Sequence, residues 1–202
     1  TSFSDRASWV RIPVRTQWLR THWPGGNGRG RGGMTKPSHV EHKEQGPIHA
    51  CCGVITVSDT RTETTDTSGQ LIRNMLAERG HTVKAYHIVP DEPSRNAPLL
   101  KTLLTAEGID AVIVNGGTGI ARRDVTYDAI SGMLEKTLPG FGELFRALSY
   151  EEIGSAALMS RATAGTVGGR VVFSVPGSSG AVRLAMERLI LPELGHILAE
   201  MR

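Results

Sequence analysis

The sequence holds only two cysteines, and they are adjacent, Cys51 and Cys52. Neighbouring residues of a strand point to opposite faces of a sheet, so a disulfide between these two would be strained. Neither has His or Cys partners at the spacing of a metal-binding or catalytic motif. We therefore predict two reduced, structural thiols in a reducing compartment.

Long apolar runs are also missing. No stretch reaches the roughly 20 apolar residues of a membrane span. The N-terminus lacks the apolar core, about 7–15 residues long, of a secretory signal. Arg6, Arg11, Arg15 and Arg20 are typical of an organelle presequence, but the apolar helical face that such a segment needs is poor. These absences predict a cytoplasmic protein without a membrane partner.

An excess of positive charge is absent from most of the chain. Residues 1–49 hold eight Lys and Arg against three Asp and Glu, whereas residues 50–202 hold 15 against 17. The net charge of +3 therefore comes from the N-terminal segment. Nucleic acid is accordingly not expected as a partner of the remainder.

Residues 1–49 are predicted to be a disordered tail. Glycine and arginine dominate 25–33, a low-complexity run. Such a run could bind RNA through charge and stacking. However, all the excess charge of the tail precedes Met34. We interpret Met34 as the natural start and residues 1–33 as upstream sequence. Residues 50–202, which follow the tail, are predicted to form one domain.

From residue 50 onward, short apolar runs rich in β-branched residues alternate with segments of helical spacing. This alternation indicates βαβ units, a mostly parallel sheet and helices on both faces, hence a three-layer α/β/α fold. The apolar helix at 180–191 must be buried, either in the core or also in an oligomer interface. The predicted strands are 53–57, 82–89, 111–114 and 171–175, and the predicted helices are 71–80, 98–107, 127–136, 143–149, 180–191 and 192–201.

A glycine-rich loop, Asn115 to Gly119, directly follows the third predicted strand. In open α/β sheets, ligands bind outside the carboxyl ends of the strands. Glycines let the backbone turn sharply and bring N–H groups close to a ligand, an arrangement that suits phosphate. A plain turn is the alternative, but it needs only one or two glycines. The spacing matches neither a P-loop nor the dinucleotide fingerprint, so those nucleotide classes are disfavoured.

Charged residues flank this loop. Arg122 and Arg123 supply forked donors for phosphate or carboxylate. Asp124 follows them, and Asp91, after the second strand, should lie at the same edge of the sheet. Two carboxylates plus phosphates are ligands that Mg²⁺ accepts. The alternative for each aspartate is a helix N-cap.

Two further polar segments end strands. Ser58 and Asp59 follow the first strand, and either Asp66 or Ser68 is expected to cap the first helix. The segment Pro176-Gly177-Ser178 ends the last strand and precedes the apolar helix. It is a second candidate for holding an anion on free N–H groups.

Taken together, these segments resemble the MoaB/MogA family of molybdenum cofactor biosynthesis. The resemblance covers about Cys51 to Arg202, and its specificity comes from the order and spacing of several short motifs. The motifs are Ser58-Asp59-Thr60-Arg61, Gly116-Gly117-Thr118-Gly119 with Arg123-Asp124-Val125-Thr126, Pro139 to Arg146, Ser160-Arg161-Ala162 and Pro176-Gly177-Ser178.

The resemblance implies a domain that binds molybdopterin, a pterin dithiolene with a terminal phosphate. In active members, molybdopterin and Mg-ATP give adenylated molybdopterin and pyrophosphate. Asp91 and Asp124 match the carboxylates tied to catalysis and to Mg²⁺. The residues implied in binding the pterin and nucleotide are Ser58, Asp59, Gly116, Gly117, Thr118, Gly119, Arg123, Ser160, Arg161, Pro176, Gly177 and Ser178.

Within the family the chain is most similar to the B-type proteins, because of its short segment 153–156 and its ending at 192–196. The resemblance to these proteins implies a homo-oligomer, either a trimer or a hexamer. Some keep the binding site without demonstrated adenylyl transfer. A non-catalytic molybdopterin carrier therefore stays open as an alternative to a molybdopterin adenylyltransferase, and tungsten stays open as an alternative to molybdenum.

Overall fold

The structure, a computed structural model, describes residues 49–122 and 124–201, with Pro93 described in its backbone only. The predictions about the tail, including its disorder, the start at Met34 and RNA binding, therefore lie outside the described residues, as does Arg123. No helix in the described ranges is long and apolar enough to cross a membrane.

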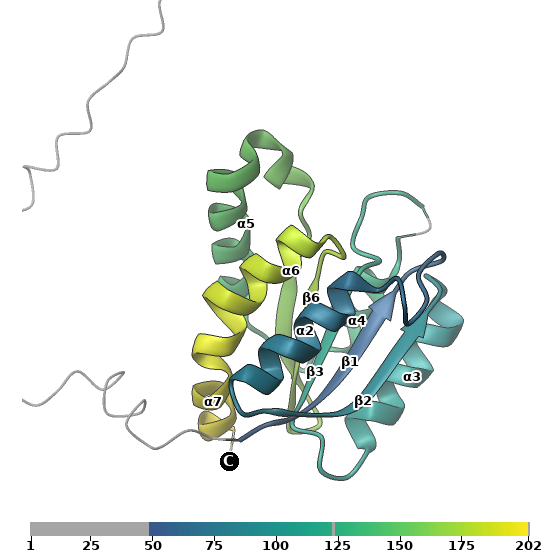
Figure 1. Cartoon of the computed structure of the whole chain (residues 1–202), viewed down its shortest axis with the longest axis vertical. Coiled ribbons are helices and arrows are strands. Elements are labelled where there is room, and N and C mark those ends of the chain that lie inside the picture. The colour runs from purple at the N-terminus through teal and green to yellow at the C-terminus, as the bar shows by residue number, and fades with distance from the viewer. Residues whose placement is uncertain (1–48, 123, 202) are drawn as a thin grey trace, which may run out of the picture. The chain divides into compact units, whose positions relative to one another are not determined.

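The described residues form a six-stranded sheet with the order β2-β1-β3-β6-β5-β4 (Figure 1). The first four strands in this order run parallel, whereas β5 is antiparallel to β6 and β4 is antiparallel to β5. The strands are β1 Cys51–Val57, β2 Thr82–Val89, β3 Ala111–Asn115, β4 Lys136–Thr137, β5 Thr163–Val167 and β6 Arg170–Val175.

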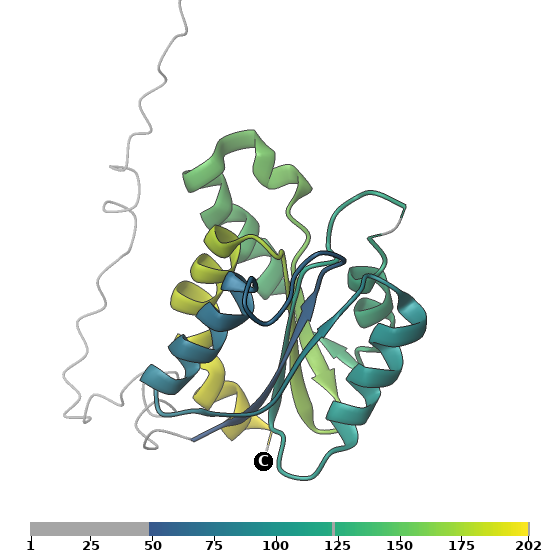
Figure 2. The ribbon, with the colours of Figure 1, turned by 45° about the vertical axis from the view of Figure 1, so that its right-hand side comes forward.

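Helices cover both faces of the sheet (Figure 2), which confirms the three-layer prediction. One face carries α2, α5, α6 and α7, and the other carries α3 and α4. The helices are α2 Thr67–Glu78, α3 Pro93–Thr105, α4 Thr126–Met133, α5 Pro139–Ile153, the 3₁₀ segment η2 Gly154–Met159, α6 Ser179–Ala185, the π-helical segment η3 Met186–Ile190 and α7 Leu191–Glu200.

The central strands supply both halves of the core. Val54, Ile113 and Phe173 pack beneath the α2 and α5 layer. Ile55 and Val112 pack beneath α3. Because a parallel strand is buried on both faces, its sequence is a continuous apolar run, and this is why these strands could be predicted.

Both cysteines are free. Burial, reinforced by the Asp110 carboxylate and by Cys51, raises the pKa of Cys52 to about 12. This thiol therefore stays protonated, as expected of a structural cysteine.

The antiparallel hairpin of β5 and β6 was not predicted. The β5 sequence is rich in small residues and carries a weak strand signal. The connecting glycines, Gly168 and Gly169, have φ of 57° and 74° and form a tight turn. The predicted helix 127–136 is also too long, because it ends at Met133 and Lys136 pairs with Thr166 in the sheet.

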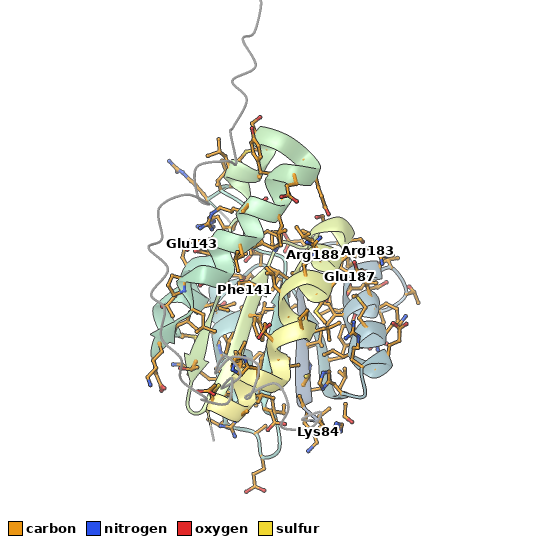
Figure 3. The ribbon with its side chains drawn as sticks, turned by 90° about the vertical axis from the view of Figure 1, so that its left-hand side faces the viewer. Lys84, Phe141, Glu143, Arg183, Glu187 and Arg188 are labelled. Atoms are coloured by element: carbon orange, nitrogen blue, oxygen red, sulfur yellow. The ribbon has the colours of Figure 1, made fainter. Side chains whose placement is uncertain are left out.

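The last two predicted helices are continuous. The Leu191 N–H donates to the Met186 carbonyl, five residues back, which is a π-helical bond. The wider turn accommodates Pro192, which has no N–H and would otherwise break the helix. Arg183 and Glu187 form an exposed ion pair on the outer side (Figure 3). The apolar stripe, including Val182, lies in the core.

Candidate anion-binding site

Three loops at the carboxyl edge of the sheet enclose a cleft of about 540 Å³. They follow β1, β3 and β6. The chain leaves β1 towards α2 on one face and leaves β3 towards α4 on the other, which is the switch point where α/β proteins bind ligands. The lining comprises Val57, Ser58, Thr60, Arg61, Asn115, Gly116, Gly117, Thr118, Gly119, Met159, Ser160, Pro176, Gly177 and Ser178.

Two positions of the glycine-rich loop require glycine. Gly116 has φ of +100°, and a Cβ there would collide with the Val57 carbonyl. Gly117 has φ of +62°, and its Cβ would lie 2.6 Å from the Thr126 Oγ1. The loop therefore turns tightly against β1 and against the start of α4.

The N–H groups of Gly117, Thr118, Gly119 and Ile120 take part in no hydrogen bond within the described residues. The first three of these residues line the cleft. A run of successive free amides is the kind of backbone nest that binds anions. The glycine-rich loop thus lies at the predicted edge of the sheet, and its binding of phosphate stays a prediction.

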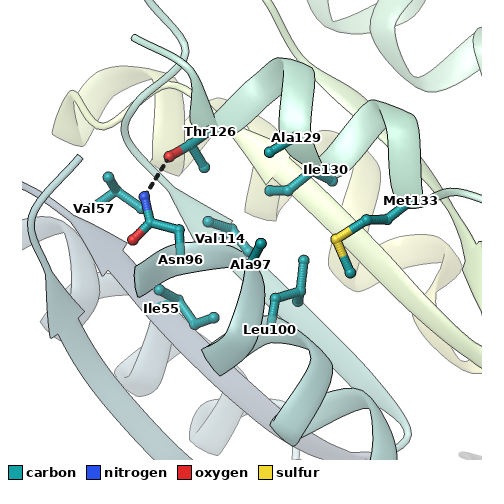
Figure 4. A pocket seen from close by; sticks show the side chains of 10 residues that line it. All are labelled: Ile55, Val57, Asn96, Ala97, Leu100, Val114, Thr126, Ala129, Ile130 and Met133. Carbon is teal, nitrogen blue, oxygen red and sulfur yellow. Dashed lines mark hydrogen bonds between the residues drawn. The ribbon is translucent and has the colours of Figure 1, made fainter. Parts of the chain in front are cut away.

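Asp91 lies against this loop. Its Oδ1 accepts from the Thr126 hydroxyl at 2.8 Å, and the Thr126 oxygen accepts from Asn96 Nδ2 at 2.8 Å (Figure 4). Burial raises the Asp91 pKa, and the Asp124 and Asp59 carboxylates raise it further, against the lowering effect of the Thr126 bond and the Val125 N–H.

This excess of negative charge fits a cation. The Asp124 and Asp59 carboxylates contribute to the raised pKa of Asp91, so a nearby Mg²⁺ would stabilise the ionised form of Asp91. No group of three or more His, Cys, Asp or Glu within the described residues is placed to hold a metal. Any Mg²⁺ here would rely on Asp91, Asp124, water and phosphate oxygens, which is a usual set for this ion.

Neither aspartate caps a helix. The N-cap of α3 is Glu92 and that of α4 is Val125, and neither helix has a side-chain cap. Asp124 instead accepts from the Ala121 N–H at 2.8 Å, beside Gly119. The capping alternative for Asp91 and Asp124 is therefore wrong.

Asp66 caps α2, as expected for one of the two candidates, by accepting from the Gly69 N–H at 2.9 Å. Burial acts to raise its pKa, but this hydrogen bond and those of Thr56, Tyr86 and Arg61 outweigh burial and lower the pKa. Its bond from the Tyr86 hydroxyl is 2.6 Å long.

Arg61 lines the cleft and was not assigned to the site from the sequence, because no phosphate motif includes it. Its Nη1 pairs with Asp66 at 3.0 Å and its Nη2 donates to the Gly177 carbonyl at 3.2 Å. These bonds leave the Nε–H and one N–H on each terminal nitrogen without a partner within the described residues. Its place as the last residue of the Ser58-Asp59-Thr60-Arg61 motif was the available signal.

Side chains of the loop after β1 form hydrogen bonds to backbone N–H groups of this loop and of Asp91. Ser58 Oγ accepts from the Arg61 N–H at 3.2 Å and from the Thr60 N–H at 3.3 Å. Asp59 Oδ1 accepts from the Asp91 N–H at 3.1 Å. Ser58 lies in the cleft, and Asp59 lies beside Asp91.

The loop after β6 meets the glycine-rich loop. A Cβ on Gly177 would lie 3.1 Å from the Gly116 Cα, and the Gly177 carbonyl accepts from Ser68 Oγ at 2.8 Å. Ser178 caps α6 through the Ala181 N–H. The two segments that were predicted to hold anions, with Pro176, therefore line one cleft.

Ser160 and Arg161 differ in their placement. Ser160 lines the cleft. The Arg161 guanidinium donates to the Thr118, Gly119 and Asp124 carbonyls and to the Asp128 carboxylate. A ligand role for Arg161 is not supported by these contacts and stays a prediction.

A second hollow lies between α3 and α4, below the Asn96 to Thr126 bond (Figure 4). Its volume is about 10 Å³, and its walls are mostly apolar, including Leu100, Ile130 and Met133. This is room for about one water molecule, so it is no ligand site.

The fold and the cleft define an α/β protein with a candidate anion site at the switch point of a mostly parallel sheet. The chain belongs to the family described as "Probable molybdopterin binding domain", which matches residues 53–196. The predicted resemblance is thus confirmed.

Individual relatives agree with this assignment. The chain is 56% identical over 165 residues to molybdenum cofactor biosynthesis protein B of Bacillus anthracis, covering 81% of this chain and 98% of that protein. A crystal structure of a molybdenum cofactor biosynthesis protein B matches with a TM-score of 0.76 at 55% identity, over 78% of this chain and 98% of that one. The tungsten cofactor synthesizing protein MoaB from Pyrococcus furiosus matches with a TM-score of 0.68 at 44% identity, over 78% and 99%.

Proposed function

We propose that this chain acts in molybdenum cofactor biosynthesis by binding molybdopterin in the cleft and adenylating it with Mg-ATP, which releases pyrophosphate. The observation that carries the proposal is the run of free N–H groups from Gly117 to Ile120 at the carboxyl edge of the sheet. The printed names of its relatives, molybdenum cofactor biosynthesis protein B, support the pathway.

The reaction forms a bond between a molybdopterin phosphate oxygen and the α-phosphorus of ATP, and it breaks the bond to the β-phosphate. Such a transfer depends on alignment and charge neutralisation more than on a strong base. The free amides and the spare N–H groups of Arg61 would hold phosphate oxygens. Mg²⁺, held by Asp91 and Asp124, would supply the neutralising charge.

A transfer assay separates this enzyme from the non-catalytic carrier. The purified chain is incubated with molybdopterin and ATP labelled at the α-phosphate. We expect label to pass into a pterin adduct, with release of unlabelled pyrophosphate, only when Mg²⁺ is present. Tight molybdopterin binding without any labelled adduct would establish the carrier instead.

We also propose that the protein is a homo-oligomer, a trimer or a hexamer. The support is a set of exposed, large apolar side chains on α5 and η2, of which Leu158 is 85% exposed and Tyr150 65%. Large exposed apolar surfaces commonly mark interfaces. Sedimentation equilibrium tests this proposal, and a monomer at micromolar concentration would refute it.

A further inference from the structure

We infer that Arg161 is a positioning residue that turns the N–H groups of the glycine-rich loop towards the cleft. It acts through the loop and not as a ligand of the phosphate. The inference rests on the proposed function for its purpose, because an oriented run of amides matters only if the cleft takes an anion.

The first support is that each nitrogen of the Arg161 guanidinium already donates to this chain. Its Nε–H donates to the Thr118 carbonyl at 2.9 Å, and Nη2 donates to the carbonyls of Gly119 at 2.5 Å and Asp124 at 3.0 Å. Nη1 donates to both carboxylate oxygens of Asp128, at 3.0 and 3.1 Å. A guanidinium has five N–H donors. Nε and both terminal nitrogens therefore all meet oxygen atoms of this chain, three of them backbone carbonyls of the glycine-rich loop and its continuation.

The second support is the geometry of the peptide group. In a trans peptide, the C=O and the N–H point in opposite directions. Because Arg161 draws the Thr118 and Gly119 carbonyls to itself, the N–H groups of Gly119 and Ile120 face the other way. These are two of the amides without a partner in the described ranges.

In the peptide group between Asp124 and Val125, the C=O and the N–H also point in opposite directions, and here the partner of the N–H is known. Arg161 holds the Asp124 carbonyl. The N–H of the same peptide belongs to Val125, and it acts on the Asp91 carboxylate, whose pKa it lowers. Arg161 and the Asp91 carboxylate therefore lie on opposite sides of this peptide group.

The guanidinium is itself fixed in place. It lies over the Tyr127 ring, with Cζ 4.6 Å from the centroid, and the forked bond to Asp128 sets its plane. A lysine has neither the planar fork nor five fixed donors, so Arg161→Lys keeps the charge and loses the arrangement.

The test compares Arg161→Lys with a matched control, Arg170→Lys. Arg170 also donates to three backbone carbonyls, those of Ala106, Ile109 and Gly168, at 3.0 to 3.1 Å. Those carbonyls lie at the opposite edge of the sheet, where β6 begins. A general loss of stability should therefore be similar in the two variants.

Two readouts are taken on the full chain. Amide NMR relaxation without ligand reports whether Gly117 to Ile120 hold one conformation. Titration with inorganic pyrophosphate, without metal, reports anion affinity at the same amides. In Arg161→Lys we expect broadened or multiple loop signals and an affinity about tenfold weaker, whereas Arg170→Lys keeps the wild-type values.

Unchanged loop signals in Arg161→Lys, or equal disturbance of the loop in Arg170→Lys, would overturn the inference. If Arg161→Lys disturbs the loop but the wild-type protein does not bind pyrophosphate there, the inference stands and the proposed anion site fails. If Arg161→Lys does not fold, Asp128→Asn takes its place, with the same loop changes expected at smaller size.

Discussion

The site depends on a few residues whose neighbours restrict them closely. Gly117 needs a positive φ, and it lies so close to Thr126 and Asp91 that any side chain would displace them. Burial raises the pKa of Asp91, and the nearby Asp124 and Asp59 carboxylates raise it further. At the scale of residues, the site therefore combines a backbone conformation that favours glycine with closely placed carboxylates, and perturbed carboxylates are typical of a functional site.

Gly117→Ala tests the backbone requirement. We expect the free energy of unfolding to fall by about 1–3 kcal/mol, because alanine is strained at this φ and meets Thr126. Binding of pyrophosphate at the loop should be lost. Gly132→Ala on α4 is the control, since a Cβ there meets nothing within 4 Å and should stabilise the helix by about 0.5–1 kcal/mol. Urea unfolding measures both variants, and equal effects would contradict the account.

Asp124→Asn tests the charge. We expect the folded state and molybdopterin binding to be kept, because asparagine can still accept from the Ala121 N–H. Formation of the labelled adduct should fall by at least about 100-fold, since one of the two proposed Mg²⁺ ligands is lost. Glu107→Gln, an exposed carboxylate, is the control and should turn over normally. Normal turnover in Asp124→Asn would show that this carboxylate serves neither metal nor catalysis.

Asp66 gives a pH-dependent prediction. Its folded-state pKa is lowered, so its contribution to stability is present above the unfolded pKa and is lost as pH falls through the folded value. The stability difference between wild type and Asp66→Asn should therefore be large at pH 7 and shrink below about pH 4. Urea unfolding from pH 7 to pH 3 measures it. A difference that stays constant over this range would refute the linkage.

At the scale of elements, strongly apolar strands could be predicted and weakly apolar ones could not. β3 is buried along its whole length and was found with nearly correct ends. β5 was missed because Ala164 and Gly165 contribute little apolar signal, although Gly165 lets the Lys136 carbonyl approach closely. α3 begins five residues ahead of its predicted start, and Pro98 lies inside it. In β5 and at the start of α3, tertiary packing and not the local sequence pattern determined the secondary structure.

The packing of α5 on β6 gives a prediction at this scale. Phe173 is 1% exposed, and its ring lies 5.4 Å from that of the half-buried Phe141. Phe173→Ala should lower the free energy of unfolding by about 3–5 kcal/mol, and Phe141→Ala by less. A double-mutant cycle should give a coupling of about 0.5–1.5 kcal/mol. Strictly additive losses would mean that the two rings do not interact.

At the scale of the whole domain, the sheet brings together loops that are far apart in the chain. The Arg61 side chain bonds the Gly177 carbonyl, 116 residues later, and Arg161 bonds the glycine-rich loop about 40 residues before it. The rule that ligands bind at the carboxyl edge located these loops from sequence. The rule does not say which donors the chain itself takes up, so it could not single out Arg61 or show that Arg161, which the resemblance implies in binding, donates to carbonyls of the loop.

The central claim is that the backbone amides of the glycine-rich loop hold a phosphate of the substrate. A crystal structure of the chain with molybdopterin tests it most directly. We predict a phosphate oxygen within about 2.7–3.2 Å of at least two backbone nitrogens between Gly117 and Ile120. A molybdopterin phosphate bound elsewhere on the protein, with these amides facing only water, would contradict the account.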